Sequence, residues 1–398
     1  MKRYLKFLVS IILMGIFVFL ISRLYKQYNI SVMDKNIKCI LSYKGLKGAE
    51  DITSDEEGNI FVAYRNKIQC IEKSGKSYDV LKDESLDITS IEYSNGQLYY
   101  ASKSEILCYS LKDKNQKIIM KDLPNFGDYR NSEIKILGEN LFISIGAATN
   151  SGVVGNDNIW LKDSPFFHDL SPKEMVIKGH NFGSEKTGAF VSYKTKSYSS
   201  QIVPSHFPGN SSIVTYNINT GVSQTFAWGI RNVTGMDFGS DGKLFAATGG
   251  MEKRGLRPVT GDCDYIYEIE NNVWYGWPDF SGGDPITSPR FRIDSNNKVD
   301  FILDKHPSSN PPAPLYQHKT VSTLGSIAID KFGYIGEKDS IYFYDFKDNN
   351  ICELNKNNVL SEKIELSKES KIGSIKFTKG KLLILDKEQG CIYFIVKK

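Results

Sequence analysis

The sequence lacks the motifs that mark several large enzyme classes. It has no Gly-x-Ser-x-Gly nucleophile elbow, no phosphate-binding loop and no dinucleotide-binding fingerprint, so neither an α/β-hydrolase nor a nucleotide-binding fold is indicated. Sustained 3.6-residue periodicity is also nearly absent beyond the N-terminus, which argues against a helical solenoid. Together these absences favour an all-β body.

Cysteine is scarce and scattered. The chain has six cysteines, no Cys-x-x-Cys pair and no clustering of cysteine with its five histidines, so a zinc site is not indicated. Several cysteines stand in apolar runs such as KIQCIEK and GCIYFIV. There the simplest interpretation is a small buried side chain.

Excess charge is confined to the first 26 residues. The formal net charge is +4, and residues 1–26 contain five basic residues and no acidic one. The rest of the chain is nearly neutral and has no basic stretch. We therefore expect no nucleic-acid partner.

Residues 1–26 have the pattern of a membrane anchor. Phe7 to Ser22 carries no charge and is flanked by Lys6 and Arg23. No small-residue cleavage site follows, so we predict an uncleaved signal-anchor. The basic start predicts one transmembrane helix with the N-terminus inside the cell. The remaining chain is then expected to be extracytoplasmic, at the cell membrane.

One pattern of strands and turns recurs six times. EDITSDEEGNIFVAYRNKIQCIEKSGK and LDITSIEYSNGQLYYASKSEILCYSLKD both have an alternating strand, a Gly-containing turn and two further strands. A period of roughly 40 to 50 residues built from short strands is typical of a β-propeller, with one blade per repeat. We predict an all-β, six-bladed β-propeller over residues 36–398, in which KNIKCILSYKG adds a strand to the C-terminal blade and closes the ring.

Two segments are too long for blade turns. They are residues 155–212, rich in Ser, Lys, Phe and Tyr, and residues 278–314, which contain seven prolines. We expect both to be long excursions on one face. The loops that begin blades converge on the channel of a propeller, so Arg231 and Asn232, just before VTGMDFGSDGKLFAATGG, are predicted to lie near the axis.

The segment GIRNVTGMDFGSDGKLFAATGG, followed by DYIYEIENNVWYGWPDFSGGD, resembles the glucose/sorbosone dehydrogenase family. Members of that family are six-bladed quinoproteins that oxidise aldose sugars with pyrroloquinoline quinone (PQQ) and calcium. They pass the electrons to an external acceptor. The resemblance is specific over residues 229–285 and is only architectural elsewhere.

The resemblance implies a cofactor site. Arg231 and Asn232 match the catalytic pair that faces the quinone, where a guanidinium would stabilise an oxygen that gains charge. Asp264 matches an acidic residue that contacts the cofactor. The backbone carbonyls of Gly250 and Met251 match ligands of the quinone-bound calcium. A second calcium loop, with the closely spaced oxygen ligands that suit this ion, matches Ser281, Gly283 and Asp284.

The chain departs from the family pattern at the catalytic base. That family has a histidine shortly before the strand that here reads EIKILGENLFISIG, but this chain has Tyr129 to Ser132 there. An unperturbed tyrosine, with a pKa of about 10, is a poor base near neutral pH. Gly249 stands where a glutamine is expected. His180, in GHNFG, is a candidate base on a lid, although a surface position is the simpler interpretation.

Two functions follow from these patterns. The first is a membrane-anchored, extracytoplasmic sugar dehydrogenase with PQQ, calcium and an electron acceptor of unknown nature. The second is a non-catalytic propeller whose loops bind cell-wall glycan or a protein partner, which aromatic side chains among Ser and Asn would suit. The enzyme requires a cofactor-sized pocket at the axis, whereas the binding protein requires only an exposed aromatic face.

Overall fold

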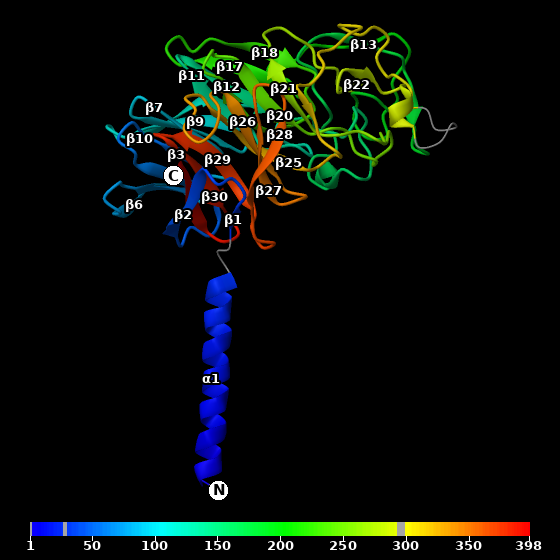
Figure 1. Cartoon of the computed structure of the whole chain (residues 1–398). Coiled ribbons are helices and arrows are strands. Elements are labelled where there is room, and N and C mark those ends of the chain that lie inside the picture. The colour runs from blue at the N-terminus through cyan, green and yellow to red at the C-terminus, as the bar shows by residue number, and fades with distance from the viewer. Residues whose placement is uncertain (1, 27–29, 293–298) are drawn as a thin grey trace.

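The computed structural model describes residues 2–26, 30–292 and 299–398. A helix, α1 (Lys2–Lys26), stands apart from a β-rich body (Figure 1). Within the described residues, no helix is both long and apolar enough to cross a membrane. The transmembrane span expected at the N-terminus is therefore not confirmed.

The body is a six-bladed β-propeller, as the sequence repeat predicts. The first three blades, each given from its inner strand outward, are β3 (Ala49–Ser54), β4 (Ile60–Tyr64), β5 (Lys67–Ile71) and β6 (Ser77–Lys82); β7 (Ile88–Ser94), β8 (Gln97–Ser102), β9 (Glu105–Ser110) and β10 (Asn115–Met120); β11 (Ile134–Leu137), β12 (Asn140–Ile145), β17 (Ser212–Asn217) and β18 (Ser223–Trp228).

The other three blades complete the ring (Figure 1). They are β19 (Val233–Phe238), β20 (Leu244–Thr248), β21 (Tyr265–Ile269) and β24 (Tyr316–Gln317); β25 (Leu324–Asp330), β26 (Ser340–Asp345), β27 (Asn350–Leu354) and β28 (Leu360–Glu365), to which β1 (Ser31–Val32) adds a fifth strand; β29 (Ile372–Thr378), β30 (Lys381–Asp386), β31 (Cys391–Lys397) and β2 (Ile37–Lys44). The pairing of β2 with β31 confirms the predicted ring closure.

Local turn chemistry explains the hairpins inside the blades. Asn95 and Gly96 join β7 to β8, and both have positive φ angles of 49° and 75°. An Asn-Gly pair with two positive φ angles forms the type I′ turn that matches the twist of paired strands. Alternating apolar residues such as Ile88, Tyr100 and Ile106 then fill the spaces between blades.

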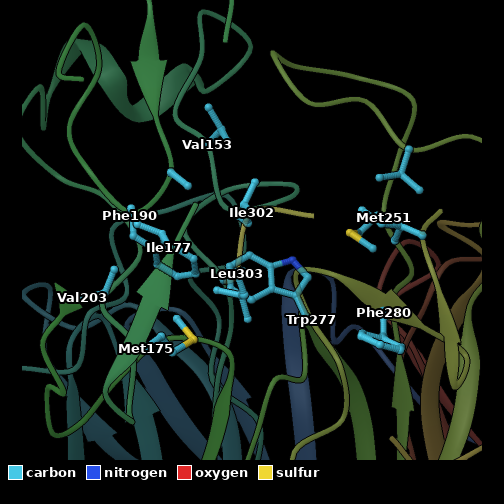
Figure 2. Close-up of a cluster of buried hydrophobic side chains, with 14 of the residues drawn as sticks. Val153, Met175, Ile177, Phe190, Val203, Met251, Trp277, Phe280, Ile302 and Leu303 are labelled. Atoms are coloured by element: carbon cyan, nitrogen blue, oxygen red, sulfur yellow. The ribbon is translucent and has the colours of Figure 1, made fainter. Parts of the chain in front are cut away.

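The two excursions form a separate layer on the propeller. The layer contains β13 (Met175–Ile177) paired with β16 (Gln201–Val203), β14 (Asn181–Phe182) paired with β15 (Thr187–Gly188), β22 (Phe280–Ser281) paired with β23 (Asp284–Pro285), and the short 3-10 helices η1 (Ile159–Lys162) and η2 (Pro289–Phe291). Ile177 forms a β-bridge with Leu303, which joins the two excursions. Figure 2 shows their shared hydrophobic core. Residues 293–298 of the second excursion lie outside the described residues.

The two faces of the ring differ. We call them the start face, where the inner strands begin, and the end face, where they finish. The excursions cover the start face, since Trp277, which leads directly into the second excursion, packs against Phe190 of the first and donates a backbone hydrogen bond to Gly229, which precedes β19. At the end face, residues at or near the ends of all six inner strands line one cavity of about 280 Å³.

Candidate functional site

Arg231 is fixed at the start face by the loop that leads into β19. Gly229 in this loop has a φ of +71°, and a Cβ atom there would collide with the Trp274 ring, so only glycine fits. The Arg231 side chain is 5% exposed. Its Nε donates to the backbone carbonyl of Asn150 (3.0 Å), and its terminal nitrogens donate to Asn150 Oδ1 (2.9 Å) and the Gly249 carbonyl (3.4 Å).

Tyr129 lies between two arginines. Its hydroxyl accepts hydrogen bonds from Arg231 and from Arg254, and the Arg231 guanidinium sits 4.3 Å above the centre of its ring. Burial raises the pKa of Tyr129, even though both guanidinium groups oppose the shift. The hydroxyl therefore stays protonated near neutral pH and is a poor general base.

Arg254 is held by three carboxylates. It contacts Asp128 and Asp157, each at 2.6 Å, and Glu252. Burial opposes ionisation of Glu252, but Arg231 and Arg254 together lower its pKa, so the carboxylate stays charged. The guanidinium thus has an anionic partner on each of its three nitrogens.

We call these side chains, with Asn150, the Arg231–Arg254 cluster. Five of its members were not predicted from the sequence: Asp128, Asn150, Asp157, Glu252 and Arg254. A signal existed in the charged loop MEKRGLRP, which follows directly on β20 and the predicted Gly250. It does not identify the partners, because Asp157 and Asp128 are 97 and 126 residues from Arg254 in the chain.

Asp264 lies beneath the loop that leads into β25 and is 1% exposed. One carboxylate oxygen accepts from the backbone nitrogens of Gly250 (3.1 Å) and Ser322 (3.0 Å). The other accepts from Thr323 (2.6 Å) and Leu324 (2.9 Å). Four backbone donors thus saturate the carboxylate, which fastens two loops together and leaves little capacity for a cofactor.

Asn232 differs from the other predicted site residues. It is half-buried, and its side-chain amide has no hydrogen-bond partner among the described residues. Arg231, next to it, lines a cavity of about 30 Å³ together with Gly249 and Met251. That volume holds about one water molecule, whereas ligand pockets typically measure about 300 Å³ or more.

Gly250 and Met251 lie beside two buried carboxylates, and the calcium role expected of their backbone carbonyls stays a prediction. Their backbone nitrogens donate to Asp264 and Asp262, and the Met251 side chain lies in the core of the excursion layer (Figure 2). Over residues 2–26, 30–292 and 299–398, no three His, Cys, Asp or Glu side chains gather in a way that could hold a metal ion.

An arginine occupies the predicted second calcium loop. Arg290, at η2, donates to the backbone carbonyl of Ser281 (2.5 Å) and to the Tyr265 hydroxyl (3.0 Å), and its Nε lies 2.9 Å from Asp284. Gly283, between them, packs near Ala313. The oxygens of Ser281 and Asp284 thus face a guanidinium, which supplies the positive charge that calcium was expected to bring.

Histidine is absent from the Arg231–Arg254 cluster as the structure describes it. His180, the candidate lid base, is exposed beside β14. His306 contacts Asp279 (3.0 Å), and His318 contacts Asp345 (2.9 Å) and Thr323 (2.9 Å), so neither is hydrogen-bonded to a member of the cluster. The residues present therefore do not fit the quinone where the resemblance places it. Arg231 and Asp264 already form hydrogen bonds with protein groups, the adjoining cavity is too small for the cofactor, and no histidine belongs to the described cluster.

Comparison with solved structures identifies the fold. A family AA12 carbohydrate-active enzyme from Trichoderma reesei superposes with a TM-score of 0.62 at 12% identity, covering 93% of this chain and 98% of the other. The PQQ domain of a pyranose dehydrogenase from Coprinopsis cinerea gives 0.60 at 11%, covering 93% and 97%. A PQQ-bound aldose sugar dehydrogenase from Streptomyces coelicolor gives 0.55 at 13%, covering 93% and 98%. No family model and no curated protein matches the chain.

These likenesses establish a glucose/sorbosone dehydrogenase-like fold, as the sequence resemblance predicts. At such low sequence identity, these likenesses show only that the fold is shared. The chemistry of this chain has to be judged from its own side chains.

Proposed function

We propose that this protein is a sugar-binding propeller with a sugar dehydrogenase-like fold, and that its start face binds ligand without quinone chemistry. One observation supports the proposal most strongly: the two guanidinium groups of the start face already have protein partners, Arg254 in its three carboxylates and Arg231 in Asn150. Breaking such a partly buried ion-pair network to admit a cofactor would leave charges without partners, which is costly.

A cleft in the excursion layer offers a place for a glycan. Its volume is about 700 Å³, and its lining includes the largely buried side chains of Trp228 and Trp274, whose ring centroids lie 6.0 Å apart. Polar side chains on its rim are exposed and include Lys173, Lys305 and Asn310. An aromatic lining with a few polar groups around it is typical of a small-molecule site. The solved neighbours named above, which are proteins of sugar chemistry, make a glycan the favoured ligand.

The test is co-sedimentation of the full-length chain with insoluble peptidoglycan. We expect the wild type to bind and the double variant Lys305→Ala/Asn310→Ala to bind at least about tenfold more weakly, since each lost polar contact removes about 1 kcal/mol. Lys356→Ala/Asn357→Ala is the matched control, an exposed Lys and Asn pair outside the cleft. If both double variants bind equally well, the cleft is not the glycan-binding site. If the folded wild type does not bind peptidoglycan, the proposal of glycan recognition is refuted.

The quinone-dependent dehydrogenase is the second candidate, and the unpartnered amide of Asn232 favours it. Titration of the full-length chain with PQQ, with and without calcium, separates the two proposals. We expect no saturable change in the quinone absorbance. Calcium-dependent binding that Asn232→Ala abolishes would restore the dehydrogenase interpretation.

We also propose that α1 attaches the propeller to a membrane, with residues 30–398 on the outer side. Apolar side chains from Val9 to Leu20 on α1 are about half exposed or more, and water disfavours such a surface. Cell fractionation tests this. The full chain should sediment with membranes and be digested by external protease, whereas a chain without residues 1–26 should remain in the soluble fraction.

A further inference from the structure

The end face carries a cavity that the proposed function does not use. All six inner strands contribute to it, through residues such as Ser54, Glu92 and Thr378. Its volume is about 280 Å³, which is close to the lower limit for small-molecule sites. The cavity lies on the axis, at the opposite end of the inner strands from Arg231.

Three lysines surround the floor of this cavity. Lys376 is fully engaged: its ammonium donates to Glu92 (3.0 Å), Asp51 (3.2 Å) and the Ile91 carbonyl (2.8 Å). Lys135 contacts Glu92 at 3.0 Å and Asp237 at 3.7 Å.

Lys331 has hydrogen-bonding capacity to spare. Its ammonium lies 3.6 Å from Asp237 Oδ1, which is beyond ordinary hydrogen-bond distance. The two oxygens of that carboxylate already accept from the backbone nitrogens of Phe238 and Ile329, each at 2.9 Å. Lys135 and Lys331 thus flank one carboxylate, with N–H donors left for a third group in the cavity.

The charge of the lining is positive. Four lysines line the cavity (Lys135, Lys331, Lys376 and Lys379), against two acids (Glu92 and Asp237). Asp51, behind Lys376, balances one lysine. Burial, and to a smaller extent repulsion from Asp51, raises the pKa of the nearby Glu133 to about 8. The Glu133 carboxyl is therefore mainly neutral at pH 7. With Asp51 counted, the four lysines exceed the three acids by one positive charge, which comes from the exposed Lys379 and which an anion would neutralise.

Aromatic side chains form the rim. Phe332 is 69% exposed, and its ring lies 5.3 Å from that of Tyr334. Tyr93 and Phe377 also line the cavity. An exposed phenylalanine over a charged floor suits a ligand that has a carbon body and an acidic group at one end.

We propose that the end-face cavity binds a small organic anion, with its phosphate or carboxylate group between Lys135 and Lys331 and its carbon body against Phe332 and Tyr334. The geometry that points to this ligand class is the pair of lysines that share Asp237 beneath an aromatic rim. This site is independent of the glycan cleft on the start face.

Calorimetry on the full-length chain tests the proposal, with phenyl phosphate and benzoate as anionic probes and phenol as the neutral probe. We expect saturable binding of at least one anion and no comparable binding of phenol. Lys331→Met should weaken anion binding by about tenfold or more, because a charge-assisted hydrogen bond is lost. Phe332→Ala should weaken it too. Both side chains are substantially exposed, so both variants are expected to fold.

The matched control is Lys356→Met, which removes an exposed lysine that pairs with Asp339 at 3.9 Å outside the cavity. It should bind as the wild type does. The proposal fails if neither anion binds the folded wild type, if phenol binds as tightly as the anions, or if Lys331→Met and Lys356→Met bind alike.

Discussion

Replacing Asp264 by asparagine distinguishes a structural carboxylate from a cofactor contact. Each Asp264 oxygen accepts two backbone N–H groups, so an asparagine NH₂ on either side would face two buried donors. Losing two charge-assisted hydrogen bonds costs about 3 kcal/mol or more. At about 2 °C per kcal/mol for a long chain, we expect Asp264→Asn to lower the Tm by roughly 6 °C.

Differential scanning calorimetry measures this shift, with Asp241→Asn as the control. Asp241 is an exposed aspartate in the turn between β19 and β20, and its carboxylate accepts one hydrogen bond, from the backbone of Lys243 (3.1 Å). We expect the control to change the Tm by about 1 °C or less. If Asp264→Asn melts with the wild type, the carboxylate is not a structural acceptor and our account of this loop is wrong.

Three further predictions follow from individual side chains. Chelation of calcium should leave the wild-type Tm unchanged. Arg290→Met should have a lower Tm that added calcium raises, because Ser281 and Asp284 lose their guanidinium partner. A wild-type Tm that falls on chelation would contradict this. The pKa of Glu133 is raised in the folded state to about 8 from about 4.3 in the unfolded chain, so the wild type loses stability as the pH rises through this window. The Tm advantage of Glu133→Gln should therefore grow between pH 5 and pH 8, and a constant difference would refute the shift. Gly255→Ala should lower the free energy of unfolding, measured in urea, by about 1–3 kcal/mol, since φ is +78° and the new Cβ would lie 2.9 Å from Asp157. The control Gly75→Ala, at φ +89° with open space around it, should lower it less.

The blades were predictable because their determinants are local. The Asn95–Gly96 turn, the alternation in ITSIEYS and the repeated Gly positions each act within a few residues, and repetition strengthens a weak pattern. Ring closure by β2 was predictable for a related reason: KNIKCILSYKG is a strand-like segment just before the first repeat, and the C-terminal blade can take it up.

The candidate site was predictable only in part, because its determinants are distant in sequence. The position of Arg231 before β19 is local, but Asn150, which accepts two of its hydrogen bonds, lies between β12 and the first excursion, 81 residues away. The resemblance carried over single residues such as Asp264 and Ser281. It carried no information on Arg254 or Arg290, whose effect depends on which carboxylates and carbonyls the fold brings to them.

Arg254 and Arg290 together explain why binding should lie away from the centre of the start face. Each guanidinium gathers oxygens that would otherwise need an external partner: three carboxylates around Arg254, and Ser281 with Asp284 around Arg290. Displacing one member of a partly buried ion pair leaves a charge without its partner, so a ligand at either place would have to replace that interaction first; the cost is larger at Arg254 than at Asp284, whose side chain is 55% exposed. The glycan cleft and the end-face cavity impose no such cost, because Lys305 and Asn310 on the rim of the first and Lys331 on the floor of the second still have hydrogen-bonding capacity to offer a ligand.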